Sequence, residues 1–214
     1  MVTFRLPEEK KYNIVDPVIK WLPEERQIKV IKTIPEVHQP IFWWLKYHLR
    51  RPSEAMALHR IDYDKEQDAF IIRRTFSAKH LVQHTKTHKI HIIPCHSEFK
   101  KIMEKMLIRI DSPFFFVNPH GKLKDEYYHY QHDYLVNLWH KACEKVGEDI
   151  DMYSGLKHSS CSQYINEKHY SLDQVQMLTD HASRQSVKKY ASVMLDEKRR
   201  LLEGKQTVYL DEVK

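Results

Sequence analysis

Apolar residues recur at helical spacing in the first quarter of the chain. Three isoleucines between positions 28 and 34 follow a period near three, which predicts a helix over Pro23 to Ile34. A similar apolar pattern predicts a second helix over Glu36 to Leu49. Pro52 then suits the first position of a third helix, because the N–H that proline lacks has no partner there in any case.

The middle of the chain changes to short runs rich in β-branched residues. The runs Ile61 to Tyr63, Ala69 to Phe76 and Ile90 to Ile93 are separated by polar segments, which predicts a small three-stranded antiparallel sheet. Helical patterns resume over Ser97 to Ile108 and over Asp125 to Val146. The sequence therefore predicts an α+β fold that is mainly helical.

The last third contains the clearest local signals. Ser171 and Gln174 have the spacing of a capping box, which predicts a helix that begins at Leu172. From Val187 to Leu195 the apolar residues follow the i, i+3, i+4, i+7 spacing of an amphipathic helix. Tyr190 lies on that apolar stripe, where a tyrosine is usually a packing residue.

Composition limits the chemistry. Lys and Arg number 35 against 29 Asp and Glu, and the net charge of +6 favours an anionic partner such as nucleic acid. The four glycines fit neither common nucleotide-binding loop, and the chain has no HExxH motif and no dense set of carboxylates for paired Mg²⁺ ions. Any phosphate chemistry is therefore expected to need no cofactor, neither metal nor ATP.

The cysteines and the apolar segments indicate a location. Cys95, Cys143 and Cys161 are widely spaced and form no CxxC pair, so the sequence indicates neither a disulfide framework nor a thiolate zinc site. The longest strongly apolar stretch, Pro40 to Leu45, is too short to cross a bilayer. We expect a cytoplasmic protein that does not engage a membrane.

Five segments, in order along the chain, resemble motifs of the tyrosine recombinase (phage integrase) family. They are residues 51–58 (RPSEAMAL), 85–94 (TKTHKIHIIP), 138–143 (LWHKAC), 155–159 (GLKHS) and 178–191 (LTDHASRQSVKKYA). These resemble the first arginine motif, the lysine hairpin, a helix, the second-arginine segment and the nucleophile segment. In the last of them a histidine stands nine positions before a tyrosine. The resemblance spans the chain from about Trp21 to Leu202 and implies the catalytic core of DNA breaking-rejoining enzymes.

The resemblance also implies a site and a reaction. Tyr190 would attack a DNA phosphorus and leave a 3′-phosphotyrosine with a free 5′-hydroxyl, as in a site-specific recombinase or DNA strand transferase. Arg51 and Lys157 would stabilise the non-bridging oxygens, where cations act on the developing charge. His181 would donate a hydrogen bond to a phosphate oxygen.

A lysine would protonate the leaving 5′-oxygen. The resemblance places Lys86 in this role, and Lys89 is a near rival in the same segment. A lysine on a β-turn is more often a solvated surface charge, so its place in the series of motifs is what supports the role.

Electrostatics supports two of these positions without reference to any family. Arg51 precedes one predicted helix, and Lys157 with His158 lies in the first turn of another, where the macrodipole is already positive. Cations there are unfavourable by several tenths of a kcal/mol, about 0.3 to 1, unless an anion binds nearby. The alternative is that they point into solvent or meet a carboxylate such as Glu54.

Two positions depart from the family pattern. Members commonly show H-x-x-R where this chain has Ser154 and, three residues later, Lys157. Lysine supplies one compact charge, whereas arginine contacts two phosphate oxygens with a planar fork. Ser154 cannot accept the proton of the nucleophile as an imidazole would, and its simplest role is that of a helix N-cap. Activity is therefore expected to be weakened.

The resemblance divides the chain into a leader or linker (1–22), a tyrosine recombinase catalytic domain (23–204) and a C-terminal tail (205–214). Family members usually have a separate DNA-clamping domain before the catalytic one, and the fifty residues before Arg51 are too few to form it. The implied partner is double-stranded DNA, bound by a homo-tetramer, in a nucleoid-associated cytoplasmic protein of a mobile element that carries out DNA integration.

Two alternatives remain at this point. The chain can be an inactive integrase remnant that still binds DNA. It can also be an unrelated basic protein in which His84, His88 and His91 bind a metal. The metal hypothesis is the weaker one, because these histidines lie in a predicted turn and strand and have few carboxylates near them in sequence to orient them.

Overall fold

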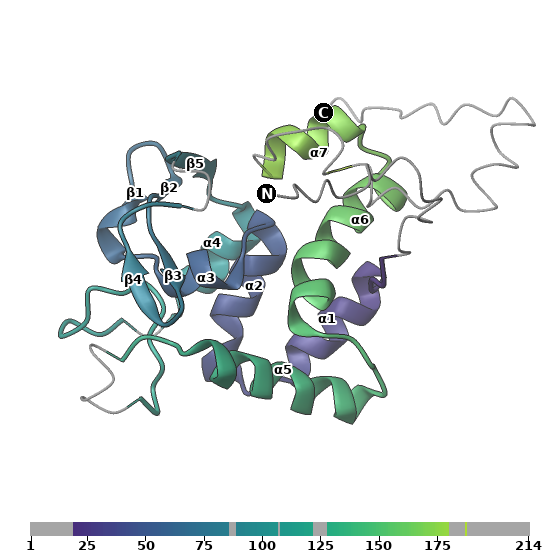
Figure 1. The fold of residues 1–214 in the computed structure, drawn as a ribbon, viewed down its shortest axis with the longest axis horizontal. Coiled ribbons are helices and arrows are strands. Elements are labelled where there is room, and N and C mark those ends of the chain that lie inside the picture. Colours follow the sequence, from purple (N-terminus) through teal and green to yellow (C-terminus); the bar gives the residue numbers. More distant parts are fainter. Residues whose placement is uncertain (1–18, 86–88, 107, 122–127, 180–186, 188–214) are drawn as a thin grey trace, which may run out of the picture.

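Helices make up most of the molecule, with two small sheets at one side (Figure 1). The structure is a computed structural model that describes residues 19–85, 89–106, 108–121, 128–179 and 187. The helices are α1 (Glu24–Thr33), α2 (Gln39–His48), α3 (Pro52–Met56), α4 (Ser97–Met103), α5 (His132–Val146), α6 (Ser159–Asn166) and α7 (Leu172–Thr179), with 3₁₀ turns η2 (Glu36–His38) and η3 (Arg60–Asp62) and a π-helical turn η4 (Ser154–His158). The strands are β1 (Tyr63–Asp64), β2 (Ala69–Ile72), β3 (Thr75–Ser77), β4 (His80–Val82) and β5 (His91–Pro94).

The larger sheet confirms the predicted three-stranded antiparallel arrangement. Its strand order is β1-β2-β5, and Phe70 of β2 faces Ile93 of β5. The strand predicted over Ile61 to Tyr63 is wrong, because residues 60–62 form η3. The cause is local: the carboxylate of Asp62 accepts a hydrogen bond from the backbone N–H of His59 at 2.8 Å and closes a turn there. Strand β1 therefore begins only at Tyr63.

A second sheet was not predicted. The strand expected over Ala69 to Phe76 divides into β2 and β3, and β3 pairs with β4 across a two-residue turn. The turn residues Ala78 and Lys79 have φ values of 45° and 70°. Hairpin turns of this kind favour Gly or Asn, because left-handed backbone is costly for other residues. The sequence therefore lacked the signal by which such a hairpin is recognised.

The predicted helices are present, and two have different ends. Helix α4 ends at Met103, short of the predicted Ile108. Helix α5 begins at His132, later than the predicted Asp125. Before it, Tyr128 has a left-handed φ of 62° and His129 pairs with Val117 in an isolated β-bridge, so the backbone there is not helical.

The capping box at the start of α7 is confirmed. The backbone N–H of Ser171 donates to Gln174 Oε1 at 2.7 Å, and the N–H of Gln174 donates to Ser171 Oγ at 3.2 Å. Helix α7 begins at Leu172 as predicted. Of the amphipathic helix predicted over 187–195, only Val187 lies within the described residues, and its side chain is buried.

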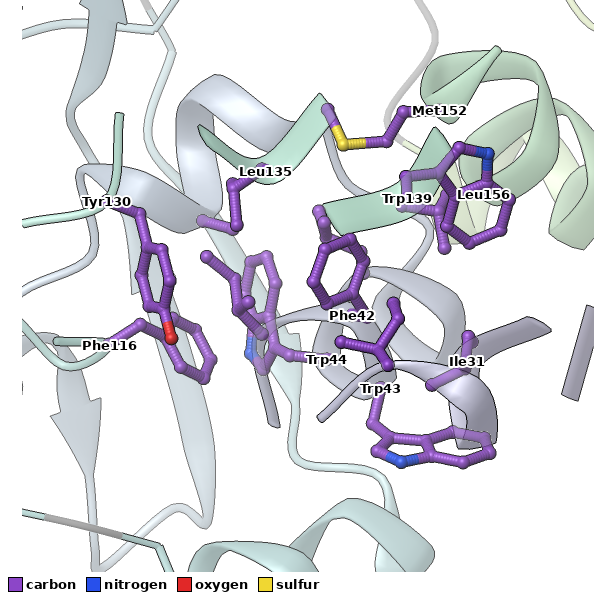
Figure 2. Packing of buried hydrophobic residues seen from close by; sticks show 14 of the residues in the cluster. Ile31, Phe42, Trp43, Trp44, Phe116, Tyr130, Leu135, Trp139, Met152 and Leu156 are labelled. Carbon is purple, nitrogen blue, oxygen red and sulfur yellow. The ribbon is translucent and has the colours of Figure 1, made fainter. Parts of the chain in front are cut away.

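An aromatic core holds α2 in the middle of the molecule. Figure 2 shows Phe42 and Trp44 of α2 among side chains from several other elements. The ring of Phe42 stacks on Trp139 of α5 with centroids 6.2 Å apart, and Trp44 meets Phe116 edge-on at 5.9 Å. Such aromatic pairs contribute beyond the area they bury. The chain that leaves α2 toward Arg51 therefore starts from a rigid base.

Trp139 also contacts Gly155 of the π-helical turn η4. A Cβ atom at position 155 would lie 2.2 Å from Trp139 Cζ2, closer than any real contact. Trp139 is fully buried, and its indole N–H donates to the carbonyl oxygen of Ile150 at 3.0 Å, so the ring has no room to withdraw. The absence of a side chain at Gly155 lets η4 pack directly on α5.

Gly155→Ala is expected to lower the free energy of unfolding by about 3 kcal/mol, because overpacking a rigid core typically costs this much. Equilibrium urea unfolding measures the change. The control is Gly147→Ala, where a new Cβ meets nothing within 4 Å but φ is +76°, so a cost of about 1 kcal/mol is expected. If Gly155→Ala were stabilising, as alanine is elsewhere in helices, the contact with Trp139 would not constrain the fold.

Candidate functional site

A left-handed residue at the end of α2 directs two arginines. Leu49 has φ 52°, a conformation that costs a residue other than glycine about 1–2 kcal/mol. Its side chain is buried in a small cluster with Cys161, Val175 and Val187, which holds the strained position in place. The backbone reversal at Leu49 turns the next two residues, Arg50 and Arg51, toward α6 and α7.

Arg51 is the N-cap of α3 and is held by a carboxylate of the same helix. Its backbone N–H donates to Glu54 Oε2 at 3.0 Å, and its guanidinium Nη1 donates to Glu54 Oε1 at 3.1 Å. Glu54 is buried, whereas a third of the Arg51 side chain is exposed. Burial opposes the charge of Arg51, but Glu54 and Tyr153 raise its pKa above its ordinary value. The contact with Glu54 that the sequence left open as an alternative is therefore present.

Lys157 lies in η4, and the helical start is not where the sequence indicated. The helical backbone begins at Met152, so Lys157 is in the second turn and not the first. Ser154 is likewise not the N-cap. Asp151 has that role, because its Oδ1 accepts a hydrogen bond from the backbone N–H of Ser154 at 2.9 Å. The macrodipole of the first turn therefore does not account for the charge at Lys157.

The wide turn of η4 frees backbone carbonyls, and buried side chains bind them. The side-chain amide of Gln27 donates to the carbonyl oxygens of Gly155 at 2.9 Å and Leu156 at 3.1 Å. The hydroxyl of Ser159 donates to the carbonyl oxygen of Ser154 at 2.7 Å. Because buried carbonyls need partners, these bonds stabilise a π-helical turn, a feature common at functional sites.

Lys157 is among the most deeply buried side chains in the molecule, with 1% of its surface exposed. Within the described residues its ammonium has neither an ion pair nor a hydrogen bond. Burial lowers its pKa to about 8, with Arg51 and Arg50 adding to the effect and Glu54 opposing it. A buried cation without a partner is costly, so this position carries charge for a reason other than packing.

Tyr153 and Arg50 belong to the same group and were not expected from the sequence. Tyr153 interacts with Arg51, and its ring meets His158 edge-on with centroids 4.7 Å apart. Arg50 is buried and donates from Nη2 to the carbonyl oxygen of Leu178, in the last turn of α7, at 3.0 Å. The sequence signal for Arg50 was only its place beside Arg51, and Tyr153 had none.

The structure places the expected lysine and histidine residues unevenly. Lys89 is exposed, and the hydroxyl of Thr85 bonds both its carbonyl oxygen at 2.7 Å and its N–H at 3.2 Å. The bonds close the two ends of the segment that contains Lys86, which itself lies outside the described residues. His158 faces Tyr153 and Asp151 rather than Arg51.

His181 and Tyr190 also lie outside the described residues, as do the leader up to residue 18 and the tail over 205–214. The structure therefore brings together Arg51 and Lys157, with Ser154 in the same turn as Lys157.

Metal and membrane sites were searched over the same described ranges. No group of three or more His, Cys, Asp or Glu side chains in those ranges is arranged to hold a metal ion. Of the three histidines considered as metal ligands, His88 lies outside the ranges. None of the helices in the described part of the chain is long and apolar enough to cross a membrane.

Arg51 and Lys157 together carry more positive charge than Glu54 neutralises. A guanidinium has five N–H donors and an ammonium has three, and the bonds to Glu54 use few of them. A phosphate group supplies both the missing negative charge and several acceptor oxygens. The arrangement is therefore suited to bind a phosphate and to stabilise charge that develops on its oxygens.

Comparisons with known proteins agree on one family and fold. The model described as the phage integrase family matches residues 22–196. The XerA recombinase structure is 14% identical, with a TM-score of 0.63 over 95% of this chain and 68% of that one. The Tn1549 transposon integrase, solved with a circular-intermediate DNA, is 16% identical, with a TM-score of 0.66 over 93% of this chain and 70% of that one. The XerH site-specific recombinase, bound to a palindromic difH substrate, is 18% identical, with a TM-score of 0.61 over 88% of this chain and 53% of that one. No curated protein matches the sequence.

Lys157→Met is expected to raise the free energy of unfolding at pH 7 by about 3 kcal/mol. The pKa of Lys157 falls from 10.5 to about 8 on folding, and each pH unit corresponds to about 1.4 kcal/mol. Below pH 8 both states carry the proton and the full cost is present. Between pH 8 and 10.5 the folded state releases its proton first, so the advantage of the methionine variant should shrink. Urea unfolding at pH 7 and 9.5 measures this, and a destabilised methionine variant would contradict it.

Proposed function

The chain belongs to the phage integrase family and has the fold of tyrosine recombinase catalytic domains, and from this premise we propose that it is a site-specific recombinase. It cleaves and rejoins DNA through a 3′-phosphotyrosine intermediate, without metal or ATP. The observation that carries the proposal is the buried ammonium of Lys157 beside Arg51, an excess of positive charge that a DNA phosphate would neutralise. Solved relatives support DNA as the partner, since the Tn1549 integrase and XerH were solved with DNA.

The reaction follows from the demands of a phosphodiester. The phenol oxygen of Tyr190 forms a bond to phosphorus while the bond from phosphorus to the 5′-oxygen breaks. Arg51 and Lys157 stabilise the charge on the non-bridging oxygens, and His181 donates a hydrogen bond to one of them. Lys86, or Lys89 in its place, donates the proton that the 5′-oxygen takes up.

The nucleophile must also lose its own proton. A phenol with a pKa near 10 is mostly protonated at neutral pH, so Tyr190 needs an acceptor or a strongly cationic surrounding. Ser154 supplies no imidazole for this purpose, and its backbone is occupied in the first turn of the helix. Activation of Tyr190 therefore depends largely on the positive charge around it, which is why the proposal includes a slow cleavage step.

The proposal extends to organisation. Residues 23–204 form the catalytic domain, preceded by a linker over 1–22 and followed by a tail over 205–214. Family resemblance supports a homo-tetramer on double-stranded DNA, and the net charge of +6 supports binding to an anionic polymer at the nucleoid in the cytoplasm. Such an enzyme would serve the integration of a mobile element.

Tyr190→Phe is expected to abolish a covalent protein–DNA adduct. A nicked suicide substrate, designed from DNA that flanks the gene, traps the phosphotyrosine because the 5′-hydroxyl fragment diffuses away. Denaturing gel electrophoresis detects the adduct. Tyr164→Phe is the matched control, because Tyr164 lies on α6, where its ring packs on Tyr170, and should leave the adduct unchanged. An adduct that persists in Tyr190→Phe would refute the assignment of the nucleophile.

Cleavage should decline at a pH above about 8, where Lys157 begins to lose its proton. A bound phosphate favours the charged form and moves the decline upward from that value. In Lys157→Arg the decline attributable to this position should disappear, because arginine keeps its proton at every accessible pH. Single-turnover cleavage rates between pH 6.5 and 9.5 measure the effect. If both proteins lost activity over the same pH range, the charge at position 157 would not limit the reaction.

A second candidate is an inactive integrase remnant that binds DNA without cutting it. Ser154 and Lys157, which stand where relatives have histidine and arginine, favour this alternative. It is distinguished by a DNA affinity that falls steeply with salt, as expected for phosphate contacts, while no adduct forms on any suicide substrate. Fluorescence anisotropy at several salt concentrations measures that affinity.

A further inference from the structure

We propose, as a step that rests on the function proposed above, that Tyr153 is a positioning residue that holds Arg51 at the correct distance from Lys157. The two cations come from distant parts of the sequence, Arg51 from the N-cap of α3 and Lys157 from η4. Stabilisation of one phosphate by both requires that their separation be maintained before DNA arrives. Tyr153 is the residue placed to maintain it.

The partners of Arg51 differ in where they come from. Glu54 lies on α3, the helix that Arg51 itself caps, so this ion pair fixes Arg51 only relative to α3. Tyr153 lies in the helical turn that continues into η4. Of the two residues whose interactions hold the Arg51 side chain, Tyr153 alone belongs to the segment that carries Lys157. The phenol therefore links one cation to the backbone that bears the other.

The ring of Tyr153 is itself fixed in direction. His158 meets it edge-on at 4.7 Å with an interplanar angle of 75°, a contact between positions five apart that the π-helical turn allows. On either side of Tyr153, Met152 is buried and Gly155 packs against Trp139. A half-buried phenol on a rigid turn has few conformations, and its hydroxyl can orient a neighbouring guanidinium at little entropic cost.

The interaction with Tyr153 leaves Arg51 free to act on a phosphate. Arginine has five N–H donors; one bonds Glu54 Oε1, and the phenol oxygen of Tyr153 can accept another. The remaining donors are available for phosphate oxygens, and a third of the side chain is exposed to receive them. Without the hydroxyl, Arg51 keeps its charge and its bond to Glu54 but gains freedom to rotate. A misplaced cation of this kind slows a reaction without preventing binding, because binding sums many phosphate contacts.

The test compares Tyr153→Phe with Tyr164→Phe, a control that removes a hydroxyl from α6 away from Arg51. Phenylalanine keeps the ring on His158, so Tyr153→Phe should fold with an unchanged melting temperature. Its single-turnover cleavage of the suicide substrate should be about tenfold slower, with unchanged DNA affinity. In an Arg51→Lys background the same substitution should have no further effect, because both act through one interaction. A wild-type rate in Tyr153→Phe, or an equal loss in Tyr164→Phe, would overturn the proposal.

A second measurement does not depend on activity. The side-chain Nε–H signal of Arg51 in a ¹⁵N NMR spectrum is identified by its loss in Arg51→Lys. We expect this signal to shift in Tyr153→Phe and to stay in place in Tyr164→Phe. If the wild type forms no adduct, the proposed function fails while this signal still decides the role of Tyr153. An unchanged Arg51 signal in Tyr153→Phe would overturn the positioning role whatever the cleavage rates show.

Discussion

The close packing of Trp139 on Gly155 is the constraint from which the site is built. With no side chain at position 155, η4 lies directly against α5, and the turn can widen toward the interior. A wide turn would be unstable alone, because it leaves carbonyl oxygens without helical partners. The buried amide of Gln27 on α1 binds two of them. Three segments far apart in the sequence thus cooperate to hold one turn, and that turn carries both Tyr153 and Lys157.

Burial of Lys157 opposes stability and supports the proposed chemistry. A buried ammonium without a partner lowers the stability of the fold, as does the left-handed backbone at Leu49 that directs Arg51. Both costs occur in the same small region, where the aromatic core around Phe42 and Trp44 is rigid enough to sustain them (Figure 2). Strain concentrated beside a surplus of cations is what a site prepared for an anion requires, since the cations are already in place when the phosphate arrives.

Local sequence patterns predicted those elements whose causes are local. Helix α7 begins where its capping box indicates, and α3 begins at Pro52 as expected. Elsewhere, contacts between distant segments overrode the pattern. The pairing of His129 with Val117 delays the start of α5, and β3 turns into β4 through Ala78 and Lys79, residues with no preference for that turn. Here pairing with residues far along the chain determines the conformation.

The ordered motifs of the sequence identified the family and the region of the site, because a family pattern is a property of residue types and their spacing. They did not reveal that Lys157 is buried rather than presented in a first helical turn, or that Asp151 caps the helix in place of Ser154. They gave no reason to consider Tyr153. Burial, pKa and the approach of Tyr153 to Arg51 depend on which distant segments pack together, and only the three-dimensional arrangement of α2, α3 and η4 decides that.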